Sequence, residues 1–203
     1  MVRVRQHSSL ARLLAGGLLA AGGLAPPVAR AQAAGTPTHH DGVYGRFDGD
    51  LDLGFALGAE LGSAGGVTPA LRASAHYFSI AGVYASGRGH AADQSAPSLF
   101  GAGVDLRPLF LPRWAKGFET GPGFFDLTLD SVSLSLGAFW AAHERRGFDA
   151  QLGFGLPLLA SAAGPWLEAR GALRYPDSSE REGAVTVALA WHGFVTTPFS
   201  AEH

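Results

Sequence analysis

Residues 48–61 read DGDLDLGFALGAEL, and this stretch decides the fold. Its large apolar side chains stand two positions apart, and the positions between them are small or acidic. The apolar set is Leu51, Leu53, Phe55, Leu57, Ala59 and Leu61. Successive side chains of an extended chain point to opposite faces, so the pattern predicts a β-strand with one apolar and one polar face. The alternation exceeds an average strand of about 5 to 6 residues and is close to the roughly 9 to 11 that a tilted strand needs to cross a bilayer.

The same alternation recurs along the chain, and it predicts eight strands. They cover residues 48–61, 67–76, 78–87, 98–108, 131–142, 148–156, 166–175 and 183–194. The second and third strands are divided near Tyr77, because one strand of their combined length would be about twice what a membrane requires. Four short polar loops, residues 62–66, 88–97, 143–147 and 176–182, are expected at the outer end of these strands.

Residues 109–130 interrupt the pattern with several Gly and Pro residues. The phase of Phe125, Leu127 and Leu129 does not continue into the fifth strand, which predicts a bulge or a chain break near Asp130. We favour extra strand or a folded turn for this connection. The alternative is a functional segment whose aromatic side chains lie at the membrane interface. Those side chains are Trp114, Phe118, Phe124 and Phe125.

The first 33 residues have the composition of a secretory signal. Arg3, Arg5 and Arg12 form a basic start, residues 13–24 a short apolar run, and residues 31–33 a small-residue cleavage box. We therefore predict a signal peptide at residues 1–33, a flexible N-terminal segment at 34–47 and a β-barrel domain at 48–199. Although residues 39–41 read His-His-Asp, three adjacent ligands do not define a coordination geometry, and no metal site is predicted.

Composition excludes several classes of function. The 203 residues include no cysteine, so neither disulfides nor thiolate metal sites are possible. Removal of the predicted signal would take away four arginines and no acid, changing the formal charge from -2 to -6. Such an acidic chain is poorly suited to nucleic acid, whose phosphates would repel it.

The residue types on the polar face decide which side of the strands faces the solvent. A soluble exterior should carry many Lys, Glu and Thr residues, yet the only lysine is Lys116, and the polar face is mostly Gly, Ala and Ser with charges of both signs. Buried charges are tolerable when paired, and the interior of an eight-stranded barrel is narrow enough to be filled by side chains. We therefore predict an all-β, antiparallel up-and-down transmembrane β-barrel with a lipid-facing apolar exterior and a small, polar interior.

The charged residues of the polar face are predicted to form an ion-pair network in the lumen, the interior of the barrel. This network comprises Asp50, Asp52, Glu60, Arg72, Asp105, Arg107, Asp149, Glu168, Arg170 and Arg174. Aromatic residues near the strand ends are predicted to form interfacial girdles on the exterior. These are Tyr84, Phe100, Trp140, Phe148, Tyr175 and Trp191.

With a signal-like start, an even strand count and stretches such as residues 49–54 (GDLDLG) and 133–140 (SLSLGAFW), the chain resembles the small eight-stranded Gram-negative outer-membrane β-barrels of the OmpA and OmpX class. The resemblance covers residues 48–194 and implies an address in the outer membrane. It rests on architecture and carries no site residues. We therefore expect a monomer whose partner is outer-membrane lipid.

No catalytic motif stands out. Because some barrels of this class deacylate lipopolysaccharide with a nucleophilic serine, a histidine and an acid, we considered a lipid-modifying hydrolase. His76 and Ser79 have the wrong spacing for strand geometry, and His192 is simply an interior polar residue. We predict a structural or interaction protein with neither catalytic site nor cofactor. The alternatives are that hydrolase and a soluble periplasmic barrel binding an apolar ligand.

Overall fold

A computed structural model describes residues 44–63, 66–90, 98–118, 121–141, 145–177 and 180–197 of the chain. The predicted signal peptide, the His-His-Asp triplet and the last residues of the predicted barrel domain lie outside this part. The strands are β1 (Leu51–Gly62), β2 (Val67–Tyr77), β3 (Ala81–Arg88), β4 (Leu99–Leu106), β5 (Ser133–Ala141), β6 (Arg146–Pro157), β7 (Gly164–Pro176) and β8 (Glu182–Val195).

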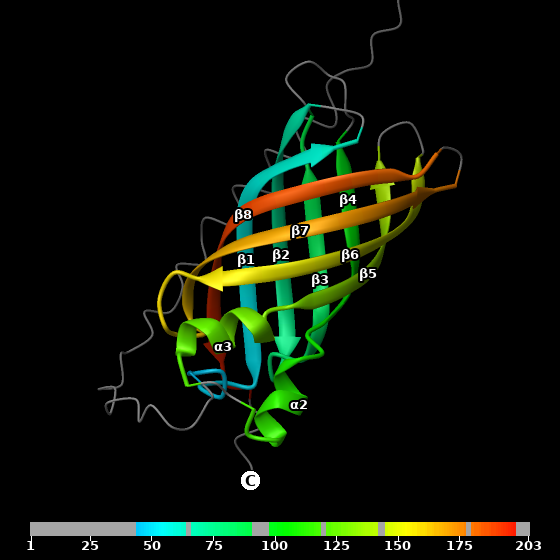
Figure 1. The fold of residues 1–203 in the computed structure, drawn as a ribbon. Coiled ribbons are helices and arrows are strands. Elements are labelled where there is room, and N and C mark those ends of the chain that lie inside the picture. Colours follow the sequence, from blue (N-terminus) through cyan, green and yellow to red (C-terminus); the bar gives the residue numbers. More distant parts are fainter. Residues whose placement is uncertain are drawn as a thin grey trace, which may run out of the picture. The chain divides into compact units, whose positions relative to one another are not determined.

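The eight strands form one closed barrel in sequence order, with β1 hydrogen-bonded to both β2 and β8 (Figure 1). Every neighbouring pair is antiparallel. The fold class predicted from the alternation, an up-and-down barrel of eight strands, is therefore confirmed. The predicted break near Tyr77 is also confirmed, because β2 ends at this residue and β3 begins at Ala81.

The barrel is staggered, as closure of a tilted sheet requires. Paired residues can be followed once around it. The path runs from Leu51 through Tyr77, Ala81, Leu106, Leu134, Leu152, Gly171 and Val185 to Leu61. The path returns to β1 ten residues beyond its start, at Leu61. Each pairing step therefore shifts the path along the barrel axis, toward the end at which β1 finishes.

Large apolar side chains cover the exterior, and charges lie inside. Leu57, Leu136 and Leu189 are exposed, whereas Asp52 and Asp105 are buried. The inward and outward sets match the predicted ones on β1, β2, β4, β5, β6, β7 and β8. Alternation of side chains across the strand thus produces a barrel whose apolar surface faces outward.

The phase predicted for β3 is wrong. Tyr84 was assigned to the exterior girdle, but it is 3% exposed inside the lumen, and Val83 is 59% exposed outside. The prediction counted from Phe78, which belongs to the turn between β2 and β3 and not to the strand. Because one residue of register moves every side chain to the other face, this start inverted the strand. The other five predicted girdle residues are outward and at least partly exposed.

The connection between β4 and β5 is helical, which corrects the favoured extra strand or folded turn. It contains α2 (Phe110–Ala115) and α3 (Gly123–Asp130), at one end of the barrel (Figure 1). The break in phase predicted near Asp130 coincides with the end of α3. Neither helix in the described part of the chain is long and apolar enough to span a membrane.

Helix α3 is fixed against the barrel by its apolar inner face. Leu127 is fully buried in a cluster with Ala56, Ala162 and Trp166, and the Trp166 Nε1 donates to the carbonyl of Ala162 at 3.0 Å. The helix begins after Pro122, and Asp126 in its first turn complements the positive end of the helix dipole. The helix therefore packs across the end of the lumen where the turn between β2 and β3 lies. We call this the turn-side end, and the opposite end, at Gly62, the loop-side end.

Candidate functional site

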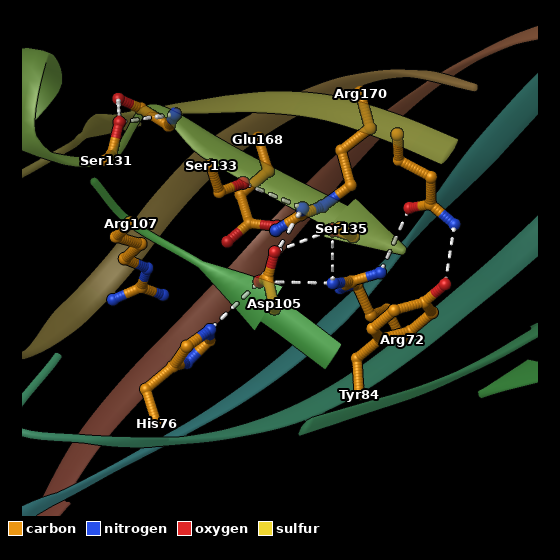
Figure 2. Close-up of polar contacts among 12 residues, drawn as sticks. Arg72, His76, Tyr84, Asp105, Arg107, Ser131, Ser133, Ser135, Glu168 and Arg170 are labelled. Atoms are coloured by element: carbon orange, nitrogen blue, oxygen red, sulfur yellow. Dashed lines mark hydrogen bonds and ion pairs between the residues drawn. The ribbon is translucent and has the colours of Figure 1, made fainter. Parts of the chain in front are cut away.

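Asp105 of β4 is the centre of the polar lumen (Figure 2). This residue is 0% exposed. Its Oδ1 accepts a hydrogen bond from Ser135 Oγ at 2.6 Å, and its Oδ2 lies 2.9 Å from His76 Nε2 and 3.2 Å from Arg72 Nη2. The partners of this β4 residue come from β2 and β5, because the lumen-facing positions of the three strands meet at this level. Asp105 thus joins three strands through one carboxylate.

Arg72 extends the network toward β3 and β6. Its Nη1 donates to Gln151 Oε1 at 3.1 Å, and its guanidinium lies 3.9 Å above the ring of Tyr84. The Tyr84 hydroxyl in turn donates to Asp149 Oδ1 at 2.9 Å. Gln151 Nε2 also donates to Asp149. A cation–π contact and hydrogen bonds that link Arg72 and Asp149 to the neutral side chains of Gln151 and Tyr84 therefore complete this side of the lumen.

A second branch starts from Asp52 of β1. Arg107 Nη1 donates to Asp52 Oδ2 at 2.6 Å, and His192 Nδ1 lies 3.0 Å from Asp52 Oδ1. The other ring nitrogen of His192 lies 3.1 Å from Glu168 Oε1. His192 is thus a bridge between β1 and β7.

Arg170 brings the two branches together. Its Nη2 donates to Glu168 Oε2 at 3.2 Å, its Nη1 donates to Ser133 Oγ at 3.1 Å, and the same Nη1 lies 4.0 Å from Asp105 Oδ2. The charges of opposite sign are therefore interleaved across the middle of the lumen. Such pairing offsets the large desolvation cost of burying ions.

A separate cluster lies near the loop ends of the strands. Arg174 donates from Nη1 and Nη2 to the two carboxylate oxygens of Glu60, at 2.8 and 2.7 Å. Arg88 Nη1 donates to Glu60 Oε1 at 2.8 Å. Bidentate geometry of this kind gives both energy and directional specificity. One glutamate thereby holds β1, β3 and β7 together.

A third cluster lies under the helices at the other end. Arg113 of α2 donates to Asp126 Oδ1 and Asp130 Oδ1 of α3, both at 2.6 Å, and Arg46 Nη1 lies 2.9 Å from Asp130 Oδ2. Tyr44 donates its hydroxyl to Asp126 at 2.9 Å. Burial lowers the pKa of Arg46. For Arg113, burial lowers the pKa, but the hydrogen bonds that it donates to Asp126 and Asp130, together with their negative charges, outweigh this effect, so the pKa is raised.

The structure brings together most of the residues predicted for the lumen. The predicted acids paired with predicted arginines are Asp52 with Arg107, Glu60 with Arg174, Asp105 with Arg72, and Glu168 with Arg170. Two predicted acids are held differently. Asp149 bonds to Tyr84 and Gln151, whereas Asp50 accepts from the backbone N–H of Thr197 at 2.6 Å and from its hydroxyl.

Sequence reasoning missed Arg88, Tyr84 and the two histidines as network members. The sequence predicts a loop that begins at Arg88, whereas Arg88 is the last residue of β3. His76 and His192 were in the inward phase, and this was the available signal. The wrong phase of β3 concealed Tyr84.

Little space is left in the lumen. One cavity of about 40 Å³ lies between the loop-side cluster and Arg72, and another of about 20 Å³ lies between Asp52 and α3. Each is large enough for only roughly one to three water molecules. Within the described residues, no group of three or more potential metal ligands is found.

No model of a known protein family matches the sequence, and no curated protein is detectably similar to it. The fold is similar to that of the designed transmembrane barrel TMB2.3, with 15% identity and a TM-score of 0.44 over 70% of this chain and 93% of that chain. Another designed transmembrane β-barrel gives 10% identity and a TM-score of 0.41 over 71% and 96%. Ail, the attachment invasion locus protein of Yersinia pestis, solved with the heparin analogue sucrose octasulfate, gives 12% and 0.35 over 70% and 96%.

Proposed function

We propose that this chain is an integral outer-membrane β-barrel of structural or interaction type that has no catalytic site. The observation that carries the proposal is the inverted distribution of side chains. Leu57, Leu136 and Leu189 are exposed on the exterior, and the described acids of the strands are mostly buried in the lumen. Soluble monomers rarely expose apolar patches of more than a few hundred Å², whereas a lipid-facing barrel requires a continuous one.

The filled lumen supports a structural rather than a transport role. Charges of both signs are paired across it, and the two cavities of about 40 and 20 Å³ among the described residues hold only water-sized molecules. The same polar lumen is unsuited to an apolar ligand, which counts against the soluble periplasmic alternative. Closure of the barrel leaves no strand edge for β-pairing with another copy, so we propose a monomer surrounded by outer-membrane lipid.

Membrane fractionation with heat-dependent gel migration tests this proposal. The full chain, expressed in a Gram-negative host, should sediment with the outer membrane and require detergent for extraction. Unboiled samples should migrate differently from boiled ones, because the closed barrel resists unfolding. Full solubility without detergent would overturn the proposal.

The lipid-modifying hydrolase requires a serine whose proton a histidine can accept. Among the described residues, Ser135 donates to Asp105, Ser133 accepts from Arg170, and neither His76 nor His192 is hydrogen-bonded to a serine. We therefore expect lipid A of the same mass in cells with and without the protein. A loss of acyl chains that depends on the protein would favour the hydrolase.

A further inference from the structure

A run of aromatic rings connects the barrel exterior to helix α2. Tyr77 at the end of β2 lies 4.6 Å from Phe78, ring centre to ring centre, and Phe78 lies 6.3 Å from Phe47. Phe47 in turn lies 5.3 Å from Trp114 of α2. Tyr77, Phe47 and Trp114 are all exposed. The apolar surface of the strands therefore continues beyond their turn-side ends and onto the helix.

The two helices are held in a fixed orientation by their inner faces. Phe110 of α2 is buried against Phe47 and beneath the guanidinium of Arg46, at 5.9 and 4.4 Å. Leu127 of α3 is buried in the barrel cluster, and Arg113 ties the two helices together. Because these contacts fix the helices, the side chains on the opposite faces remain exposed.

Those opposite faces are large and apolar. Their exposed side chains are Leu111 and Trp114 on α2 and Phe124 and Phe125 on α3, and Phe118, in the connection after α2, is exposed as well. Phe118 is 63% exposed. Burial of an aromatic side chain removes roughly 150 to 250 Å² from water, so this surface gains considerable free energy when it is covered.

A basic side chain accompanies the aromatic rings. Lys116, which follows α2, is exposed, and its Nζ lies 5.9 Å from the ring centre of Phe118. Lysine and aromatic residues are the side chains that sit at the boundary between acyl chains and headgroups, since the ring enters the apolar layer and the ammonium reaches the phosphates.

We infer that the exposed faces of α2 and α3 lie in the phospholipid headgroup region of the leaflet at the turn-side end of the barrel. The inference rests on the proposed membrane-spanning function, and the continuous aromatic surface from Tyr77 to Trp114 argues for lipid as the occupant. In this arrangement Trp114, Phe118, Phe124 and Phe125 enter the upper part of the acyl layer. Lys116 is directed to lipid phosphates, and the helices cap the lumen from the membrane surface.

Tryptophan quenching tests the inference in the full chain refolded into vesicles of phosphatidylcholine and phosphatidylglycerol. Acyl chains brominated near the headgroup quench tryptophans in the lipid, and acrylamide quenches those in water. Three variants each remove one emitter: Trp114→Phe in α2, Trp191→Phe on the outer face of β8, and Trp166→Phe in the lumen as the shielded reference. Trp114→Phe should reduce the bromine-quenched emission and leave the acrylamide-quenched emission unchanged.

The two proposals fail in different ways. If Trp114→Phe reduces only the acrylamide-quenched emission while Trp191→Phe reduces the bromine-quenched emission, the barrel spans the bilayer but the helices face water, and the inference is overturned. If Trp191→Phe also leaves the bromine-quenched emission unchanged, the proposed membrane-spanning function itself fails. A fourth variant, Phe124→Trp in the Trp114→Phe background, reports on α3 and should restore bromine-quenched emission. If acrylamide alone quenches the emission of the added tryptophan, α3 faces water and does not lie in the lipid.

Discussion

Glu60 on β1 and Arg174 on β7 form a bidentate ion pair across the lumen, at 2.8 and 2.7 Å, although the two strands are not neighbours in the barrel. Arg88 donates to the same carboxylate from β3. A contact between strands that share no backbone hydrogen bonds restrains the cross-section of the barrel. Closure of the sheet and filling of the lumen are therefore coupled at the loop-side end.

Loss of the Glu60 charge should destabilise the barrel strongly. Glu60→Gln leaves two buried arginines without their carboxylate, and removal of one partner of a buried pair costs about 3 to 5 kcal/mol. Water in the adjacent cavity can solvate the arginines, so we expect a value near 3 kcal/mol. Urea titration of the chain refolded into vesicles measures it. Glu180→Gln, at an exposed position, is the matched control, and an equally small loss in both variants would contradict the role of Glu60.

Leu134→Arg tests which face of the strands meets lipid. The stagger places Leu134 at the fourth of the eight pairing steps from Leu51 to Leu61, so it lies at a level halfway between these two residues near the ends of β1. An arginine on the lipid face costs about 2 to 4 kcal/mol at the bilayer midplane and about 0 to 1 near its interfaces. Leu61→Arg, at the loop-side end of β1, should therefore cost much less. Equal unfolding free energies for the two variants would count against a bilayer around the strands.

The turn between β2 and β3 should be stabilised by Ser79→Gly. Phe78 and Ser79 both have positive φ, 48° and 56°, and the buried Ser79 hydroxyl has no hydrogen-bond partner among the described residues. A left-handed conformation costs a non-glycine residue about 1 to 2 kcal/mol, so the glycine variant should gain about 1 kcal/mol in unfolding free energy. Ser79→Ala is the control, because it removes the hydroxyl and keeps the strain. The explanation by strain is wrong if the alanine variant gains as much.

The residues that form the turn between β2 and β3 could not be predicted from the sequence. The alternation of apolar and polar residues predicted the strands, because a sheet with one apolar and one polar face requires this alternation in every strand. Phe78 and Ser79 carry no turn signal, since Gly or Asn normally fills such positions, and the phase of β3 was therefore miscounted. Helices of 6 and 8 residues between Phe110 and Asp130 are too short to display a helical period among several glycines and prolines.

The candidate site, like the fold, could be predicted only in part from the sequence. The alternation of residues within each strand predicted that Glu60, Arg72 and Arg174 face the lumen. This prediction is possible from the sequence because the alternation does not depend on neighbouring strands. Which arginine meets which acid depends on the stagger between strands, and one sequence does not provide it. Glu60 on β1 thus meets Arg174 on β7, and Asp50 meets Thr197 beyond β8.

The stability of the β1–β8 junction should depend on pH through Asp50. Hydrogen bonds from Thr197 hold the pKa of Asp50 below its ordinary value of 3.8. The stabilising contribution is therefore fully present above that value and is lost as the pH falls through the lower folded-state pKa. We expect Asp50→Asn to be less stable than the unaltered chain at neutral pH, and the difference to shrink in strong acid. Urea midpoints at several pH values measure it, with the exposed Asp48→Asn as control; a difference that stays constant would exclude this linkage.

Gly137→Ala should disturb the lumen around Tyr84. A Cβ at Gly137 would overlap the Tyr84 hydroxyl and the backbone carbonyl of Ala102, and would lie 2.9 Å from Asp149 Oδ1. Overpacking of this kind typically costs about 1 to 3 kcal/mol. At Gly171, on the exterior, a Cβ would meet nothing within 4 Å, so Gly171→Ala should be neutral or slightly stabilising. Tyr84→Phe removes the overlapping hydroxyl, and the double variant with Gly137→Ala should lose less than the sum of the two single changes. A strictly additive loss in the unfolding free energy would show that Gly137 does not make room for Tyr84.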